Sequence, residues 1–196
     1  MDEPTAAASF YSSAQRALDD GASPAELGDE LERLWTERYR MQTAGVTELV
    51  TFEHGGAKYL FDKAEVYDRS IAAVGFAETP LAPRNRGYQA GFPLKADPER
   101  PVDRGHMIPS SAGGLYGPNL FRQDRALNRG WSDEGKAYRK IESFAVSHHS
   151  FFFCALVYCD DTDFPALIEL GKVYERRLEV TLFRNRFDVY TEEVAT

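Results

Sequence analysis

The chain has 196 residues, of which 43% are apolar and 13% aromatic, an ordinary globular composition that excludes an intrinsically disordered protein. Its length suits one domain with a substantial core. No run approaches the roughly 18 apolar residues of a membrane-spanning helix, and the acidic first residues lack the apolar stretch of a secretory signal peptide. We therefore expect no membrane segment, and either a cytoplasmic protein or export by a route that does not use an N-terminal signal peptide.

The charge of the chain is unevenly distributed. The formal net charge of −8, taken as a whole, argues against a protein that binds nucleic acid. Residues 1–40 carry four basic and nine acidic residues (net −5), whereas residues 100–140 carry eight basic and four acidic residues (net +4). A local basic field around residues 100–140 is suited to a phosphate-bearing substrate. The alternative is one mixed, solvated face.

Residues 1–43 predict a helical N-terminal extension. Residues 10–18 favour a short helix, and Ser23-Pro24-Ala25-Glu26 is a capping box that predicts a second helix from Pro24 to about Thr43. Apolar residues recur along the second helix at helical spacing, namely Leu27, Leu31, Leu34, Trp35 and Met41. We expect this stripe to pack on the core, with partner binding as the alternative.

Most of the remaining regular segments predict strands. They are residues 46–52 and 58–61 (a hairpin around His54-Gly55-Gly56), 71–77 (or a helix), 151–158, and a hairpin of 177–183 with 187–190 across Arg184-Asn185-Arg186. Residues 151–158 are an uninterrupted apolar run, which is typical of a central strand buried on both faces. Cys154 and Cys159 point to opposite faces of such a strand, so we expect two free, buried thiols and a reducing compartment.

Three short segments carry the candidate chemistry. They are Asp103-Arg104-Gly105-His106-Met107-Ile108-Pro109, Pro118-Asn119-Leu120-Phe121-Arg122-Gln123 and Leu127-Asn128-Arg129-Gly130. Their order predicts a strand, a loop, a short strand and a helix. An imidazole can take a proton from water near neutral pH, an amide oxygen can hold Mg²⁺ without neutralising it, and an arginine can clamp phosphoryl oxygens. This set suits phosphodiester cleavage with a single hard cation.

These motifs resemble the DNA/RNA non-specific endonuclease family, whose ββα-metal (His-Me finger) core is shared with the Serratia-type nuclease and endonuclease G. The likeness rests on DRGH at residues 103–106 with Asn119, Gln123 and Asn128 at the family's spacing. It implies an α+β fold with a ββα-metal nuclease core on a mainly antiparallel sheet. Residues 44–196 would form the endonuclease-like domain, and residues 1–43 the extension.

The resemblance also implies roles for individual residues. His106 would be the general base, Arg104 would neutralise charge on the scissile phosphate, and Asn119 would orient His106 or the phosphate. Asn128 would be the direct protein ligand of Mg²⁺, for which Mn²⁺ would substitute. Arg84 or Arg86, in the proline-rich loop at residues 79–101, and Arg129 would contact the substrate.

The acidic residue that would hold a metal-bound water has more than one candidate. Lys136 stands where the family has a glutamate, and Glu142 recovers the family's local context if residues are inserted before it. Fourteen continuous helical positions from Asn128 to Glu142 would span roughly 21 Å, too far for one metal shell, so the inserted residues must loop out, and Gly130 and Gly135 are where they could do so. If they do not, Glu134 or Asp133 is the better candidate.

Three functions compete on these observations. The first is a Mg²⁺-dependent endonuclease that cleaves DNA, RNA or both with little sequence specificity. The second is a catalytically silent relative that binds nucleic acid or a partner, and the third is a fortuitous motif in an unrelated α+β domain. An active nuclease also suggests an inhibitor or carrier protein as partner. Residues 1–22 would then act as an electrostatic brake on the basic motif, or as a tail without effect.

Overall fold

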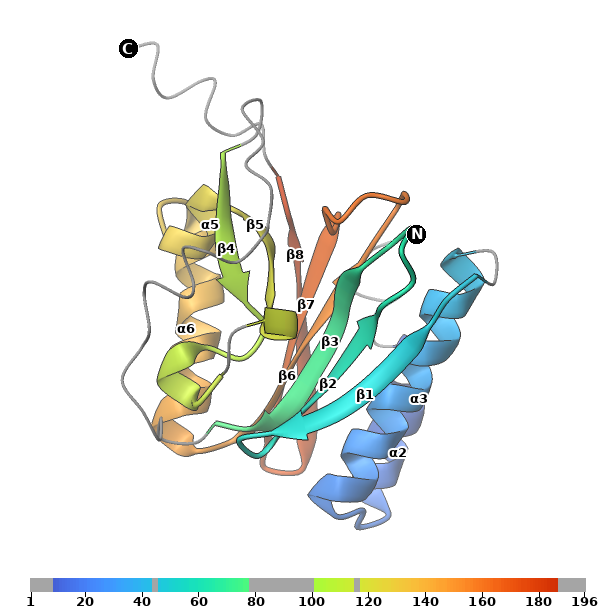
Figure 1. Cartoon of the computed structure of the whole chain (residues 1–196). Helices are drawn as coiled ribbons and strands as arrows, with labels where there is room; N and C mark the ends of the chain where they lie inside the picture. Colours follow the sequence, from blue (N-terminus) through green and yellow to red (C-terminus); the bar gives the residue numbers. More distant parts are fainter. Residues whose placement is uncertain (1–8, 44–45, 78–100, 115–116, 187–196) are drawn as a thin grey trace.

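The computed structural model describes residues 9–43, 46–77, 101–114 and 117–186, and its main sheet has six antiparallel strands (Figure 1). The strands are β1 (Leu49–His54), β2 (Ala57–Asp62), β3 (Arg69–Phe76), β6 (Phe151–Val157), β7 (Leu167–Tyr174) and β8 (Arg177–Arg184). They lie side by side in the order β1-β2-β3-β6-β7-β8. The predicted α+β class with a mainly antiparallel sheet is confirmed.

A second, two-stranded antiparallel sheet carries the motif. It consists of β4 (Val102–His106) and β5 (Leu120–Asp124), and between them lie two short 3-10 turns, Ser110–Ala112 and Gly117–Asn119. Helix α5 (Arg125–Arg129) follows β5 directly, and α6 (Asp133–His148) leads back to the main sheet at β6. The predicted order of strand, loop, short strand and helix is therefore confirmed.

The central strand β6 separates two layers that cover opposite faces of the sheet. The Phe153 ring packs on Tyr11 and Trp35, with ring centroids 5.3 and 5.2 Å away. The next residue, Cys154, lies beside Tyr138 of α6, because successive side chains of a strand alternate between faces. Helices α2 (Ser12–Asp19) and α3 (Pro24–Gln42) thus cover one face, and α6 with the β4–β5 hairpin covers the other (Figure 1).

Helix α3 begins as the sequence predicts. The Ser23 hydroxyl accepts a hydrogen bond from the Glu26 backbone N–H, and the Glu26 carboxylate accepts one from the Ser23 backbone N–H at 2.8 Å. Leu27, Leu31 and Trp35 of the predicted stripe are buried in the core. Core packing is therefore confirmed for this helix, although Met41 at its end is 81% exposed.

A buried polar network ties both N-terminal helices to the sheet. Arg38 of α3 donates two hydrogen bonds to the Glu169 carboxylate, at 2.9 and 2.8 Å. The Tyr11 hydroxyl donates a third to the same carboxylate, and the Trp35 indole N–H donates to the Tyr11 hydroxyl at 3.0 Å. Glu169 lies on β7 and is only 4% exposed. Arg38 compensates its charge, and Tyr11 of the same N-terminal segment adds a neutral hydrogen bond.

This packing contradicts the electrostatic brake for residues 9–22. Tyr11, Ala14 and Leu18 are buried in the core shared with the sheet, on the face away from the β4–β5 hairpin. Residues 1–8 lie outside the described part of the chain. The division at residue 43 into an extension and a nuclease-like domain stays a prediction, but the described helices on its N-terminal side share one core with the strands on the other side.

Strand β8 forms a hairpin with β7 that the sequence analysis did not predict, in register from Leu167↔Arg184 to Tyr174↔Arg177. The turn is made by Glu175 and Arg176, both at positive φ (49° and 62°), which non-glycine residues rarely adopt. Cys159 is a free thiol as predicted but exposed, because β6 ends at Val157. Residues 187–190, the second strand of the hairpin predicted across Arg184-Asn185-Arg186, lie outside the described part, so that hairpin stays a prediction.

Among the described residues, no helix is long and apolar enough to cross a membrane.

We predict that Arg38→Met will lower the free energy of unfolding by about 3–5 kcal/mol, because it leaves the buried Glu169 carboxylate without its cation while keeping most of the apolar stem. Urea unfolding at neutral pH measures the change. Arg33→Met, on the same helix, is the matched control. The Arg33 side chain is 48% exposed and pairs with Glu30 and Glu37, so its loss should change the free energy of unfolding far less than the loss of Arg38 does. Equal losses in the two variants would contradict the role of the network.

Candidate active site

The β4–β5 hairpin places the motif residues in fixed register. Arg104 pairs with Arg122, and His106 with Leu120, while Asp103 pairs with Gln123 on the alternate positions. Gly105 lies between Arg104 and His106, where a Cβ atom would come within 2.4 Å of the Gln123 side-chain oxygen. The glycine of the DRGH motif is therefore required by the close packing of Gln123 across the hairpin.

Asp103 is the centre of the polar contacts between the hairpin and α5. Arg129 donates to both of its carboxylate oxygens, at 2.6 and 3.0 Å. Arg125 donates to Oδ1 at 3.2 Å, and the Asn128 amide nitrogen donates to Oδ2 at 3.1 Å. Burial would raise the pKa of Asp103, but the hydrogen bonds from Arg129 and Asn128 and the positive charges of Arg129 and Arg125 outweigh it, and the pKa is lowered. The carboxylate is therefore ionised at neutral pH.

The ionised Asp103 determines the orientation of the Asn128 amide. A carboxylate can only accept hydrogen bonds, so Asn128 must turn its NH₂ group toward Asp103 and its Oδ1 atom away. Within the described part of the chain, no hydrogen bond uses this Oδ1 atom, and the side chain is half-buried. Asn128 therefore presents an oriented amide oxygen, which is the kind of ligand that a hard cation prefers.

Asn119 fixes the segment that follows His106. Its amide oxygen accepts from the Ile108 backbone N–H at 2.8 Å, and its amide nitrogen donates to the Ile108 carbonyl at 2.9 Å. The Met107 N–H donates to the Asn119 carbonyl at 2.9 Å. Asn119 is 1% exposed, so these contacts hold the end of β4 against the start of β5 from inside the protein. These hydrogen bonds place Asn119 next to the backbone of the two residues that follow His106.

Polar side chains that sequence reasoning missed fasten β5 to the rest of the fold. Arg122 donates to Asp163 at 2.6 Å, and its guanidinium carbon lies 4.5 Å from the ring centroid of Phe164. The Asn185 amide accepts from the Asp124 N–H at 2.7 Å and donates to the carbonyls of Arg122 and Pro165. No local pattern marks these residues, because each contact joins segments far apart in the sequence.

A β-bulge in β3 provides a further contact between the main sheet and the segment before β5. Leu60 pairs with Ala72 but Phe61 pairs with Ser70, so Ile71 is an extra residue in β3. A bulge re-aims the side chains beside it, and the Ser70 hydroxyl donates to the Pro118 carbonyl at 2.6 Å. The main sheet thus holds the residue immediately before Asn119.

The helix after Asn128 is interrupted, as the sequence analysis required. Gly130 has φ 70°, and the N–H groups of Gly130 and Trp131 donate to the carbonyls of Leu127 and Ala126, a Schellman motif that ends α5. Ser132 then caps α6 by accepting from the Gly135 N–H at 3.0 Å. Gly135 is not a second break. It lies in the first turn of α6, where a Cβ would be 2.5 Å from the Ala126 carbonyl, so it allows the two helices to approach closely.

Glu142 lies on the side of α6 that faces the sheet. Burial raises its pKa to about 7, partly opposed by the charge of Arg139, and its own charge raises the pKa values of Tyr138 and Cys154. Its role beside a metal-bound water stays a prediction. The two alternative candidates for this role, Asp133 and Glu134, are both exposed, unlike Glu142, and Asp133 pairs with Lys136 at 2.8 Å.

The other predicted site residues have the following places. Arg104 and His106 are half-buried on β4, and the His106 Nε2 atom lies below the surface. Arg129 is 46% exposed in its side chain and already binds Asp103, so its contact with substrate stays a prediction. Arg84 and Arg86 lie outside the described residues. Among the described residues, no group of three or more His, Cys, Asp or Glu side chains could hold a metal ion.

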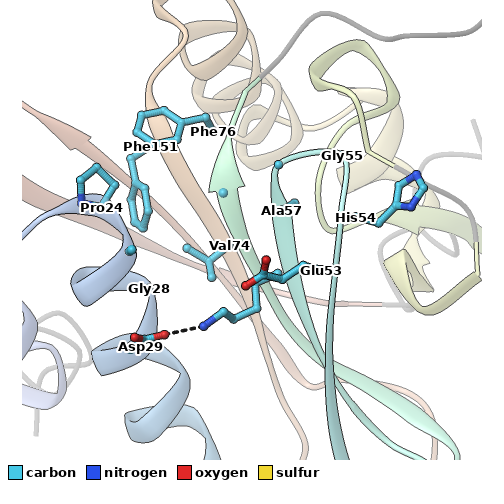
Figure 2. Close-up of a pocket in the computed structure, with 14 residues that line it drawn as sticks. Pro24, Gly28, Asp29, Glu53, His54, Gly55, Ala57, Val74, Phe76 and Phe151 are labelled. Atoms are coloured by element: carbon cyan, nitrogen blue, oxygen red, sulfur yellow. Dashed lines mark hydrogen bonds and ion pairs between the residues drawn. The ribbon is translucent and has the colours of Figure 1, made fainter.

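A cavity of about 570 Å³ lies elsewhere and contains none of these residues. Figure 2 shows it between the start of α3 (Pro24, Gly28), the turn after β1 and the end of β3, with Phe76 and Phe151 at one side. Its Lys58 side chain pairs with Asp29 and Glu32. We assign it no chemical role.

The comparisons with known proteins give a partial likeness to two nucleases. No family model matches the chain, and no curated protein sequence matches it. Among solved structures, NucA from Streptococcus agalactiae, with a magnesium ion bound, is 14% identical with a TM-score of 0.45, over 77% of this chain and 89% of that one. An extracellular nuclease is 14% identical with a TM-score of 0.43, over 74% of this chain and 86% of that one. At scores this low the likeness decides nothing about function.

We predict that Glu142→Gln will change the pH dependence of stability. A carboxyl group whose pKa is higher in the folded than in the unfolded protein binds its proton more tightly when the protein is folded. Its contribution to the free energy of unfolding is therefore full below the unfolded pKa and is lost as pH rises to about 7. The wild type should lose stability between pH about 4.5 and 7, and the variant should be more stable at pH 8 by at most about 3 kcal/mol, since partial exposure screens the effect. Urea titrations at pH 5 and 8 measure this, and the exposed Glu134→Gln is the control. Parallel pH profiles of wild type and Glu142→Gln would contradict it.

Proposed function

We propose that this protein is a Mg²⁺-dependent endonuclease that hydrolyses phosphodiester bonds of DNA, RNA or both with little sequence specificity. The observation that carries the proposal is the Asn128 amide, which Asp103 turns so that its oxygen is presented near the end of α5. Directly before α5 stands the hairpin that bears Arg104 and His106. One small unit of two strands and a helix therefore carries an imidazole, an oriented amide oxygen and arginines. We propose that this unit is a ββα-metal core.

His106 is proposed to take the proton from the attacking water. Histidine is the side chain that exchanges a proton most readily near neutral pH. It is the last residue of β4, and the chain after it is held by the contacts of Met107 and Ile108 with Asn119. The imidazole is thus carried on a backbone that does not need to reorganise when substrate binds, which favours general base catalysis.

The arginines are proposed to hold the phosphate. Arg104 shares the strand with His106, and a guanidinium can bind two phosphoryl oxygens at once. Arg125 and Arg129 together carry two positive charges against the single charge of Asp103, so one positive charge remains around this carboxylate. This surplus lies next to the proposed metal ligand and opposes the net negative charge of the whole chain.

The residues present fit a single hard cation. Asn128 would bind Mg²⁺ through Oδ1, and because an amide is neutral the ion would keep most of its charge and its waters. When bound, Mg²⁺ would supply the charge that stabilises the transferring phosphoryl group and the leaving oxygen. Asp103 would not touch the ion but would hold the amide in the orientation that binds it.

The test of this function is cleavage of plasmid DNA and of RNA with Mg²⁺ and with excess EDTA. His106→Ala should lose on the order of 10²–10⁴ in rate, the range of general base catalysis, and Asn128→Ala should abolish Mg²⁺-dependent cleavage while nucleic-acid binding remains. His54→Ala, at the exposed end of β1, is the matched histidine control and should cleave as the wild type does. Mn²⁺ should substitute, and Zn²⁺ should do so poorly. Cleavage that is undiminished in EDTA, or His106→Ala within about threefold of wild type, would refute the proposal.

We predict that Asp103→Asn will weaken metal binding by about 10- to 100-fold, because an amide at 103 can donate as well as accept and no longer selects one orientation of Asn128. Calorimetric titration with Mg²⁺ and electron paramagnetic resonance with Mn²⁺ measure the affinity without turnover. Raising the Mg²⁺ concentration should restore part of the cleavage rate, which it would not do if the variant were merely unfolded. Asp161→Asn, an exposed aspartate between β6 and β7, is the control. Equal Mn²⁺ affinities of Asp103→Asn and wild type would show that Asp103 does not orient the ligand.

A further inference from the structure

Trp131 is an exposed aromatic side chain beside the candidate active site. It is 56% exposed, whereas Trp35, the other tryptophan of the chain, is 1% exposed. It follows Gly130 in the turn between α5 and α6, three positions after Asn128. The Schellman motif fixes its backbone, because its N–H donates to the Ala126 carbonyl at 2.9 Å. A large apolar ring is thus displayed from a rigid turn next to the proposed metal ligand.

The indole ring is also held by its neighbour Arg129. The Arg129 guanidinium carbon lies 4.9 Å from the ring centroid, within the range of a cation–π contact. The same guanidinium is bound in bidentate fashion to Asp103. Asp103, Arg129 and Trp131 therefore form a continuous series of contacts, which couples the position of the ring to the carboxylate that orients Asn128.

The Schellman motif by itself does not account for a tryptophan here. The apolar contact that accompanies this motif joins the residue after the glycine to the helix, and any aliphatic side chain can make it. A ring that is more than half exposed contributes little to the core. Its flat surface is instead suited to stacking, and base stacking on aromatic side chains tolerates any base sequence.

The charges around the ring are compatible with a nucleic-acid strand. Arg139 of α6 donates to the Arg129 carbonyl at 3.2 Å, so a second exposed guanidinium lies at the same turn. Asp133 begins α6 nearby, but Lys136 pairs with it at 2.8 Å, and Glu134 is exposed beside it. The basic side chains therefore at least balance the acidic ones around the turn.

We propose that Trp131 stacks on an unpaired base of the nucleic acid whose phosphate lies at Asn128. The inference rests on the proposed function and deepens it, because it names the substrate form that this site prefers: single-stranded or locally opened DNA or RNA. A paired base is stacked within its duplex and does not offer its face to the ring. Arg129 positions the ring, and Trp131 makes the contact.

Fluorescence titration in EDTA tests the proposal without cleavage. The probes are oligo(dT), oligo(U) and a blunt DNA duplex of the same length. Because Trp35 is buried, quenching by the single strands reports Trp131. Trp131→Leu keeps an apolar contact at the turn but should lose about 10- to 100-fold in affinity for single strands, whereas Trp131→Phe should stay within about threefold of wild type. Fluorescence anisotropy of labelled oligonucleotides measures these affinities in all variants.

The controls separate this inference from the proposed function. Phe76→Leu removes another exposed aromatic ring, at the cavity of Figure 2, and should leave binding unchanged. Single-strand affinity of Trp131→Leu equal to that of wild type, an equal loss for single strands and duplex, or no binding of either would overturn the inference. The result is independent of turnover: wild-type cleavage without a Trp131 effect refutes only the stacking, and stacking without cleavage refutes only the nuclease.

Discussion

A single constraint shapes the whole fold: β6 is apolar along its length and must be covered on both faces. Successive side chains of β6 point to opposite faces of the sheet, so that Phe153 packs on Tyr11 and Trp35, whereas Cys154 lies beside Tyr138. A helical layer is therefore needed on each side. Gly171 of β7 completes the arrangement, because a Cβ at this position would lie 2.1 Å from the Phe153 ring. The N-terminal helices and α6 are thus two halves of one core. The motif hairpin is built onto the side that α6 covers.

The candidate site is positioned mainly by polar side chains, and this distinguishes it from the core. Asn119, Arg122 and Asn185 are each at most 5% exposed and use their hydrogen bonds to fasten the hairpin to the segments around it. Such contacts are directional, so they fix the register and angle of a small hairpin more closely than apolar packing alone. The resulting frame holds the hairpin that carries His106 and leads into the helix of Asn128, the proposed base and metal ligand, where small displacements would matter most for the proposed chemistry.

The fold also separates the charges of this acidic chain. Helix α3, which has five acidic and three basic residues, lies on one face of the sheet, and the basic motif lies on the other (Figure 1). On α3, Arg33 is paired with Glu30 and Glu37, whereas the arginines around Asp103 outnumber their carboxylate. A net charge of −8 is therefore compatible with a local field that attracts phosphate. The position of the charges matters more for such a ligand than their sum.

The sequence by itself determined the features that depend on neighbours along the chain. The capping box at Ser23, the apolar run of β6, the hairpin of β1 with β2 and the break at Gly130 all follow from short-range patterns. Tertiary structure alone decided which groups meet: Tyr11 with Glu169 across 158 positions, and Asn185 with Arg122 across 63. It also decided that β8 pairs with β7 through a turn of two non-glycine residues, and that Asp103 orients Asn128. The physical reason is that periodicity and capping act within a few residues, whereas a buried charge or amide is satisfied by whichever distant partner the folded chain brings to it.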